Sequence, residues 1–119
     1  RFCDEMVSET GLPIIVGGDF NNGKGSLQGD EPYHIMLKEG FCDTRLIAGE
    51  TSDEPTCGNS YPTVLPDKSV IARNHSEFII DYIFTYNAKH YKTKKFDVLT
   101  SEEARKSSDH SPILAIIEI

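Results

Sequence analysis

The sequence predicts an α+β fold with one mixed, mainly antiparallel sheet of about five strands and helices on one face. Several short runs rich in apolar, β-branched and aromatic residues are typical of strands, whereas stretches with helical spacing are few and short. No internal repeat or linker divides the chain. At 119 residues it is long enough for one domain over residues 1–119 and too short for two.

The first third of the chain predicts a helix, a strand and a second helix. Gly11 ends the first helix, and a strand follows at 13–16. Asp30 is expected to cap the second helix, which Gly40 ends. Four residues show the i, i+4 spacing of the first helix: Phe2 with Met6 and Cys3 with Val7.

The remaining elements alternate between strands and loops. A second strand is expected at 41–48, followed by a long loop region at 49–74 with several prolines and glycines. The run EFIIDYIFTY, Glu77–Tyr86, predicts a central strand. Three further elements complete the chain: a weaker strand at 94–99, a helical turn at 102–106 and an apolar terminal strand at 112–119.

The composition is that of a soluble globular protein, with 38% hydrophobic and 26% charged residues. No apolar run approaches the roughly 20 residues that cross a bilayer, so no transmembrane segment is expected. Because the sequence begins at Arg1 and not at Met, we expect a processed product or a fragment. The compartment, cytoplasmic or secreted, stays open. A formal charge of -7 disfavours non-specific binding to nucleic acid without excluding it.

The cysteines Cys3, Cys42 and Cys57 are widely spaced and odd in number, which indicates neither a zinc knuckle nor a complete disulfide framework. Buried free thiols are expected. The run KHYKTKK at 89–95 fits either contact with an anionic partner or a solvated strand edge, and the edge is favoured.

Polar groups stand where three strands begin or end. The run IIVGGDFNNGKGS at 14–26 stops at two glycines and then presents Asp19 and Asn21, which fits either an ordinary turn or a site. Asp81 lies inside an apolar strand, where an ionised carboxylate costs several kcal/mol unless it is paired. The best partner is His110, which follows Asp109, so we expect a hydrogen bond from His110 to Asp81.

Carboxylates on neighbouring strand ends predict a site for a hard cation, and a histidine held by an acid predicts a phosphate ligand or proton donor. A serine-hydrolase triad from Ser108, Asp109 and His110 is disfavoured, because adjacent residues of a strand point to opposite faces. The other histidines lack metal-ligand spacing and are expected at the surface: His34, His75 and His90.

Three motifs in this order, GDFN at Gly18–Asn21, IDYIF at Ile80–Phe84 and SDH at Ser108–His110, resemble the C-terminal motifs of the endonuclease/exonuclease/phosphatase superfamily. This group includes deoxyribonuclease I, abasic-site endonucleases, neutral sphingomyelinases and inositol polyphosphate phosphatases. SYP at Ser60–Pro62 also resembles bacterial members. The resemblance covers the whole chain but only the C-terminal half of the family's domain, so it implies half of a deoxyribonuclease I-like four-layer sandwich.

The resemblance implies roles for five residues. Asp19 would orient or deprotonate the attacking water, and Asn21 would hold a phosphate oxygen. Asp109, with Asp19, would hold Mg²⁺ or Mn²⁺. His110 would contact the scissile phosphate, and Asp81 would fix its tautomer and raise its pKa.

The implied function is metal-dependent hydrolysis of a phosphodiester or phosphomonoester by the full-length parent, as a nuclease, a lipid phosphodiesterase or a sugar or inositol phosphatase. The negative net charge and the absence of Trp favour a small phosphoester, lipid headgroup or sugar phosphate over DNA as the substrate. The alternative is a non-catalytic or degenerate fragment that acts as a structural or interaction module.

The chain also departs from the family. The family's metal-binding glutamate, early asparagine and further histidine have no counterpart, and Ile79 replaces a basic residue that often precedes the IDYIF motif. We therefore expect the isolated chain to be inactive. Its partner would be the missing N-terminal half of the domain or a second copy, because the apolar inner face of the sheet would otherwise be exposed.

Overall fold

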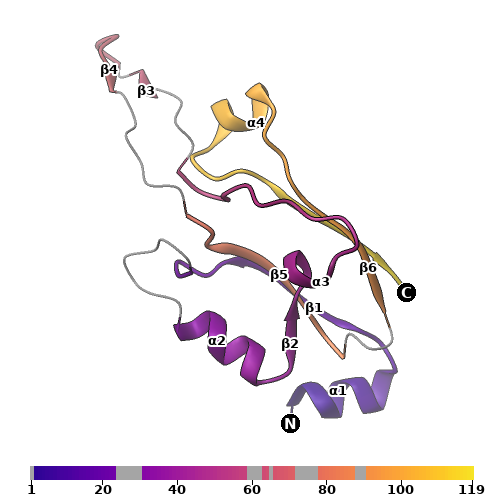
Figure 1. Cartoon of the computed structure of the whole chain (residues 1–119). Coiled ribbons are helices and arrows are strands. Elements are labelled where there is room, and N and C mark those ends of the chain that lie inside the picture. The colour runs from indigo at the N-terminus through magenta and orange to yellow at the C-terminus, as the bar shows by residue number, and fades with distance from the viewer. Residues whose placement is uncertain (1, 24–30, 59–62, 65, 72–77, 88–90) are drawn as a thin grey trace.

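The computed structural model describes residues 2–23, 31–58, 63–64, 66–71, 78–87 and 91–119 (Figure 1). The chain contains both helices and strands, and the α+β class is confirmed. In chain order the elements are α1 (Phe2–Thr10), β1 (Ile14–Asp19), α2 (Glu31–Lys38), β2 (Phe41–Asp43), α3 (Thr44–Ile47), β3 (Thr63–Val64), β4 (Val70–Ile71), β5 (Asp81–Tyr86), β6 (Lys92–Val98), α4 (Glu102–Ser107) and β7 (Ile113–Glu118). The four strands β3 to β6 follow in succession between α3 and α4.

The main sheet has three antiparallel strands in the order β1-β5-β2, so β5 is the central strand that its sequence predicts. Its side chains provide much of the core: Tyr82 is 3% exposed and Phe84 is fully buried. The register pairs Val16 with Phe84 and, at the end of β1, Asp19 with Asp81. The pairing of these strands therefore brings two carboxylate residues to the same end of the sheet.

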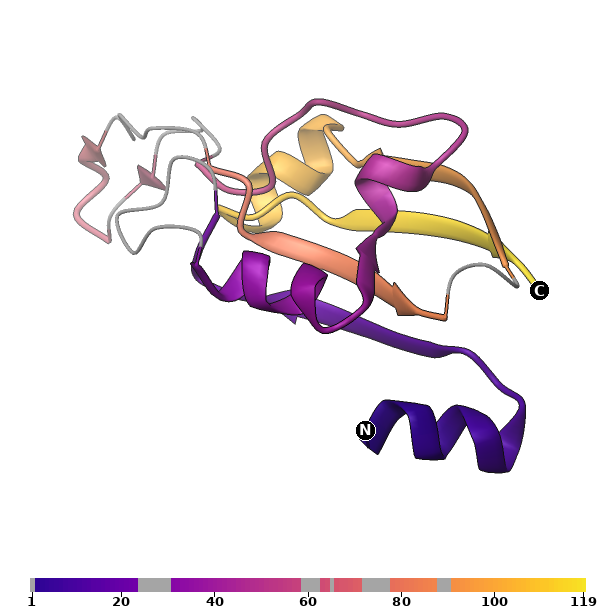
Figure 2. The same cartoon turned by 60° about the horizontal axis from the view of Figure 1, so that its bottom comes forward.

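The remaining strands form separate sheets, which corrects the expectation of a single sheet of about five strands. β6 and β7 pair antiparallel with an irregularity between Thr93 and Lys95, and β3 pairs with β4. Figures 1 and 2 show β7 running beside β5. Both edges of β5 are already paired with β1 and β2. The two-stranded sheet of β6 and β7 therefore packs beside the main sheet and does not extend it at β5.

The expected strand at 41–48 ends early, at Asp43, and α3 begins there. The Asp43 carboxylate accepts a hydrogen bond from the backbone N–H of Arg45 at 3.0 Å, as an N-cap does. Tyr33 Oη donates to the same carboxylate at 2.9 Å. This capping of a buried aspartate outweighs the strand propensity of the apolar residues that follow it.

Two glycines end helices as expected. Gly11 has φ +67° and its N–H donates to the Val7 carbonyl at 2.8 Å, and Gly40 has φ +97° after α2. The predicted cap Asp30 lies outside the described residues. α4 is one residue longer than the predicted helical turn, and Ser101 caps it by accepting from Ala104 N at 3.2 Å.

Large apolar side chains remain exposed on the strands that flank the core. Ile15 of β1 is 50% exposed, and Leu114 and Ile116 of β7 are 43% and 46% exposed. α1 contributes no buried residue. Among the described residues, no helix is long and apolar enough to cross a membrane.

Candidate active site

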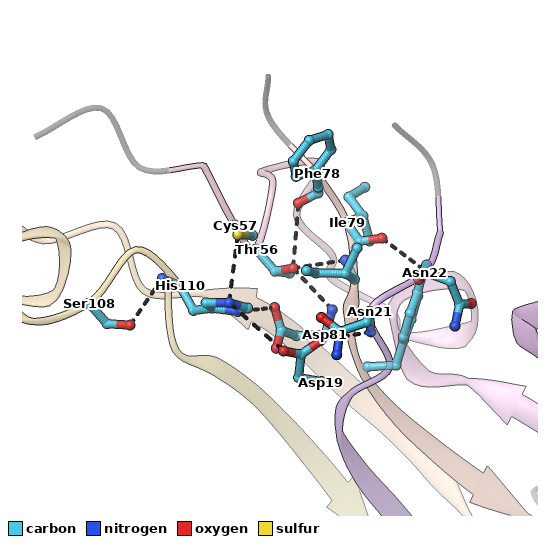
Figure 3. Close-up of polar contacts among 12 residues, drawn as sticks. Asp19, Asn21, Asn22, Thr56, Cys57, Phe78, Ile79, Asp81, Ser108 and His110 are labelled. Carbon is cyan, nitrogen blue, oxygen red and sulfur yellow. Dashed lines mark hydrogen bonds and ion pairs between the residues drawn. The ribbon is translucent and has the colours of Figure 1, made fainter. Parts of the chain in front are cut away.

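Three separate segments meet at one end of the main sheet (Figure 3). They are the end of β1 with the turn after it, the start of β5, and the turn that leads into β7. The segments carry the residues that the motifs single out: Asp19, Asn21, Asp81, Asp109 and His110.

The hydrogen bond expected between His110 and Asp81 is present. His110 Nδ1 donates to Asp81 Oδ2 at 2.8 Å, and the two side chains are 31% and 13% exposed. With Nδ1 held, the other ring nitrogen, Nε2, faces Asp19 Oδ2 at 3.9 Å. The pair thus fixes the imidazole and directs one nitrogen into the site.

The electrostatics of this pair favour a protonated imidazole. Burial by itself would lower the pKa of His110, but the hydrogen bond and charge of Asp81 act against it. The charges of Asp109 and Asp19 add to this effect, so that the pKa of His110 is raised above 6.5. His110 is therefore suited to donate a proton or a charged hydrogen bond to an anionic ligand.

The turn after β1 is shaped by the side chain of Asp19. Its Oδ1 accepts from the backbone N–H of Asn21 at 2.7 Å, and Asn21 has φ +53°, a conformation that asparagine tolerates. Farther on, a Cβ at Gly23 would overlap Tyr82 Oη and the Ile79 carbonyl, and Gly23 has φ +144°. Within the run at 14–26, Gly23 is thus a glycine whose missing side chain lets the backbone pack closely against Ile79 and Tyr82.

Thr56 supports the start of β5, a role that the sequence did not indicate. It is fully buried, and its Oγ1 accepts from the backbone N–H groups of Ile80 and Asp81, both at 3.1 Å. A buried N–H without an acceptor is costly, so this hydroxyl stabilises the segment that positions the Asp81 carboxylate.

Cys57 is a second residue that sequence reasoning missed. Its Sγ lies 3.6 Å from His110 Nε2, and 53 positions separate the two residues along the chain. Burial and the nearby charge of Asp109 raise the pKa of the thiol. No local signal indicates such a contact, because it depends on how two loops pair in the folded chain.

Two groups of ligand atoms could hold a metal ion among the described residues, and His110 belongs to both. One group adds Asp19 and Asp81, the other adds Cys57 and Asp109, and within each group the ligand atoms lie within 4.8 Å of one another. The expected metal ligands Asp19 and Asp109 thus fall in different groups that share His110. Their joint binding of a cation stays a prediction.

The site opens into a cavity of about 490 Å³ between the main sheet and the segment that leads into β7. Its lining combines polar groups with apolar strand residues: Gly17, Gly18, Asp19, Asp81, Ile83, Ser108, His110, Ser111, Pro112 and Ile113. A cavity with a few convergent polar groups is the usual form of a small-molecule site.

Two other sequence candidates, Ser108 and His34, are among the described residues. Ser108 Oγ accepts from the backbone N–H of His110 at 3.0 Å, while the imidazole nitrogens face Asp81 and Cys57, so a serine-hydrolase arrangement is not formed. His34 lies on α2 against Tyr33, with ring centroids 5.5 Å apart. The remaining candidates lie outside the described residues: Ser60–Pro62, His75 and His90.

The fold and the arrangement of these motifs define the class of protein. The chain has the fold of endonuclease/exonuclease/phosphatase proteins, as the motifs predict. No protein-family model and no curated protein matches it.

Three solved structures illustrate the similarity. An endonuclease/exonuclease/phosphatase family protein from Leptotrichia buccalis is 26% identical with a TM-score of 0.62, over 98% of this chain and 41% of that one. The endonuclease/exonuclease/phosphatase from Bacteroides vulgatus is 23% identical with a TM-score of 0.64, over 99% and 41%. A mannosyl-6-phosphatase from Bacteroides thetaiotaomicron is 24% identical with a TM-score of 0.63, over 98% and 41%. The chain therefore spans about two fifths of their length, as a part of the domain would.

Proposed function

We propose that the protein containing this chain hydrolyses phosphate esters at the site formed by Asp19, Asn21, Asp81, Asp109 and His110. The observation that supports this most is the Asp81–His110 pair, with 2.8 Å between Oδ2 and Nδ1 and with Nε2 directed toward Asp19. A histidine with a raised pKa beside an exposed carboxylate supplies an acid and a base within one small site.

A divalent cation fits the donors that are present. Asp19 and Asp109 are both exposed, each belongs to a ligand group that includes His110, and carboxylate oxygens are the ligands that Mg²⁺ and Mn²⁺ prefer. These two residues would hold the ion, which when bound would neutralise negative charge on the phosphate.

The side chains of the site would carry out the other steps of hydrolysis. Asp19 would orient the attacking water and accept its proton, and the Asn21 amide would donate to a phosphate oxygen beside it. Protonated His110 would donate to another phosphate oxygen and stabilise the developing charge, while Asp81 holds the imidazole in place.

We infer that the substrate is a small phosphate ester, with a sugar phosphate favoured. One similar structure is a mannosyl-6-phosphatase, and the net charge of -7 opposes attraction to a nucleic acid. A lipid headgroup is a related candidate, since it offers the same phosphate ester. A nuclease activity is less consistent with the charge.

The alternative is a non-catalytic module that retains the fold. It is favoured by Ile79, which stands where the family often has a basic residue before the IDYIF motif. Hydrolysis requires Asp19 and His110 for turnover, whereas a non-catalytic module shows no turnover at all.

The test is a hydrolysis assay of the full-length parent with bis-p-nitrophenyl phosphate, a hexose 6-phosphate, sphingomyelin and DNA, each with and without a chelator. We expect Mg²⁺- or Mn²⁺-dependent turnover that Asp19→Asn and His110→Ala each lower by about 10²- to 10⁴-fold. His34→Ala is the matched control, because His34 lies on α2 and outside the cavity. Metal-independent turnover, or variants as fast as the wild type, would contradict the mechanism, and no turnover with any substrate would favour the non-catalytic module.

A further inference from the structure

A thiol lies at the candidate active site, and the proposed hydrolysis gives it no role. Cys57 Sγ is 3.6 Å from His110 Nε2, the ring nitrogen that faces the site. The Asp109 carboxylate completes a group of sulfur, nitrogen and oxygen donors whose ligand atoms lie within 4.8 Å of one another.

The backbone holds these donors together. Gly58 N–H donates to the Asp109 carbonyl at 3.1 Å, and Ser111 N–H donates to the Thr56 carbonyl at 2.8 Å. Cys57 and His110 lie between these two bonds as an isolated antiparallel bridge. In such a non-hydrogen-bonded pair the two side chains stand close together on one side of the bridge. The approach of sulfur to imidazole is thus fixed before any ligand arrives.

The spacing of the donors matches a tetrahedral ion. Zinc–sulfur and zinc–nitrogen bonds of about 2.3 and 2.0–2.1 Å at a tetrahedral angle place the two donors about 3.5–3.6 Å apart. The observed separation is 3.6 Å. Asp81 on Nδ1 adds the carboxylate that commonly orients a zinc-bound histidine.

We propose that Cys57, Asp109 and His110 form a site for a thiophilic divalent cation such as Zn²⁺, which shares Asp109 with the proposed oxygen-donor site for Mg²⁺. Binding forms bonds from the metal to sulfur, to Nε2 and to a carboxylate oxygen, and the thiol proton and the Nε2 proton of the protonated imidazole pass to solvent. A water molecule would complete the tetrahedron. The hard ion Mg²⁺ gains little from a thiolate, so the cysteine makes the site selective for softer metals.

Occupation of this site would inhibit hydrolysis. Nε2 of His110 cannot bind both zinc and a phosphate oxygen, and Asp109 would be withdrawn from the Mg²⁺ site. This consequence rests on the proposed function, whereas metal binding does not.

Binding is tested first on the chain itself, with Co²⁺ as a spectroscopic substitute for Zn²⁺. We expect thiolate-to-cobalt charge-transfer absorption that Zn²⁺ displaces and Mg²⁺ does not. Cys57→Ser should abolish the band, while Cys42→Ser, which changes a thiol of β2 outside the group, should retain it. Asp81→Asn should weaken Zn²⁺ binding about 10- to 100-fold. Circular dichroism of each variant separates loss of binding from loss of folding.

The absence of a thiolate band in the folded wild-type chain would overturn the proposal and leave the short contact as a hydrogen bond between Cys57 and His110. A band that persists in folded Cys57→Ser would overturn it as well. A band that disappears only in that variant supports it, whether or not the parent hydrolyses phosphate esters.

Inhibition is then measured on the full-length parent as the ratio of rates with and without added Zn²⁺, each variant against its own rate. We expect micromolar Zn²⁺ to inhibit the wild type and Cys42→Ser, and Cys57→Ser to need at least tenfold more. Hydrolysis that Zn²⁺ inhibits equally in all three proteins would overturn the inhibitory role. A parent without turnover would instead contradict the proposed function and leave the binding result standing.

Discussion

The imidazole of His110 is contacted at both ring nitrogens by residues far away in the sequence. Asp81 accepts from Nδ1 at 2.8 Å, and Nε2 faces Cys57 Sγ at 3.6 Å and Asp19 Oδ2 at 3.9 Å. Because two of these three neighbours are carboxylates, the protonated ring is favoured in the folded state. The protonation of His110 therefore couples the stability of the fold to pH.

The first prediction concerns this coupling in the metal-free chain, with a chelator present. The folded-state pKa of His110 is raised above 6.5, so the pair's contribution to the free energy of unfolding is complete below that pH. It is lost as pH rises through the raised pKa. Asp81→Asn should move the pKa of His110 downward and remove this stabilisation at low pH. An NMR titration of the imidazole and thermal unfolding at several pH values measure both effects.

Glu118→Gln is the control for this titration, because it removes an exposed negative charge of β7 that pairs with Lys94. It should leave the titration of His110 almost unchanged. A wild-type His110 that titrates at or below 6.5, or an Asp81→Asn variant that titrates like the wild type, would contradict the prediction.

At the scale of elements, the start of β5 depends on a loop that is distant in sequence. Thr56 Oγ1 accepts from the N–H groups of Ile80 and Asp81, and the Phe78 carbonyl accepts from the N–H groups of Thr56 and Cys57 at 2.9 and 3.0 Å. The loop thereby supplies hydrogen-bond partners that the sheet itself does not provide there.

We predict that Thr56→Val destabilises the chain by about 1–3 kcal/mol, since it keeps the shape but leaves the buried N–H of Ile80 and the part-buried N–H of Asp81 without their acceptor. Thr56→Ser keeps the hydroxyl and should cost less, about the value of one buried methyl group. Urea unfolding measures both, with an unchanged m-value as evidence that the unfolded state is the same. A valine variant as stable as the serine variant would show that the hydroxyl is unimportant.

Sequence patterns predicted those elements whose signals are local. The apolar run of β5, the glycines after α1 and α2, and the terminal strand β7 are all present. The division into two main sheets and the start of α3 were missed, because they depend on which edges of β5 are occupied and on a buried cap at Asp43.

In the candidate site, too, contacts with a local sequence signal were predictable and contacts that depend on tertiary packing were not. The contact between Asp81 and His110 was predictable because a carboxylate in an apolar strand needs a partner. The contribution of Thr56 and Cys57 was not, because each depends on a tertiary contact with a residue at least 24 positions away. Their residue types are common in ordinary loops, so the sequence offers no sign of either role.

At the scale of the whole molecule, the chain is more extended than a closed domain of its length. Its radius of gyration is 16.7 Å, with principal extents of 57 × 27 × 23 Å. A compact domain of this length has a radius of gyration of about 13.5 Å. Among the described residues, β1 pairs only with β5 and β7 only with β6, so each leaves one edge without a strand partner.

The last prediction follows from these open edges and from the apolar side chains beside them. Ile15, Leu114 and Ile116 are between 43% and 50% exposed, and burying such a side chain stabilises by about 1.5–3 kcal/mol. We therefore expect the isolated chain to associate with a second copy or, when it is supplied, with the remaining part of its parent domain. Light scattering should give a mass above 13.3 kDa for the chain alone. Ile116→Lys should shift it toward the monomer, because it places a charge on β7, whereas Leu46→Lys, at a 68% exposed position of α3, should not. A 13.3 kDa monomer that binds no hydrophobic dye would show instead that these strands need no partner.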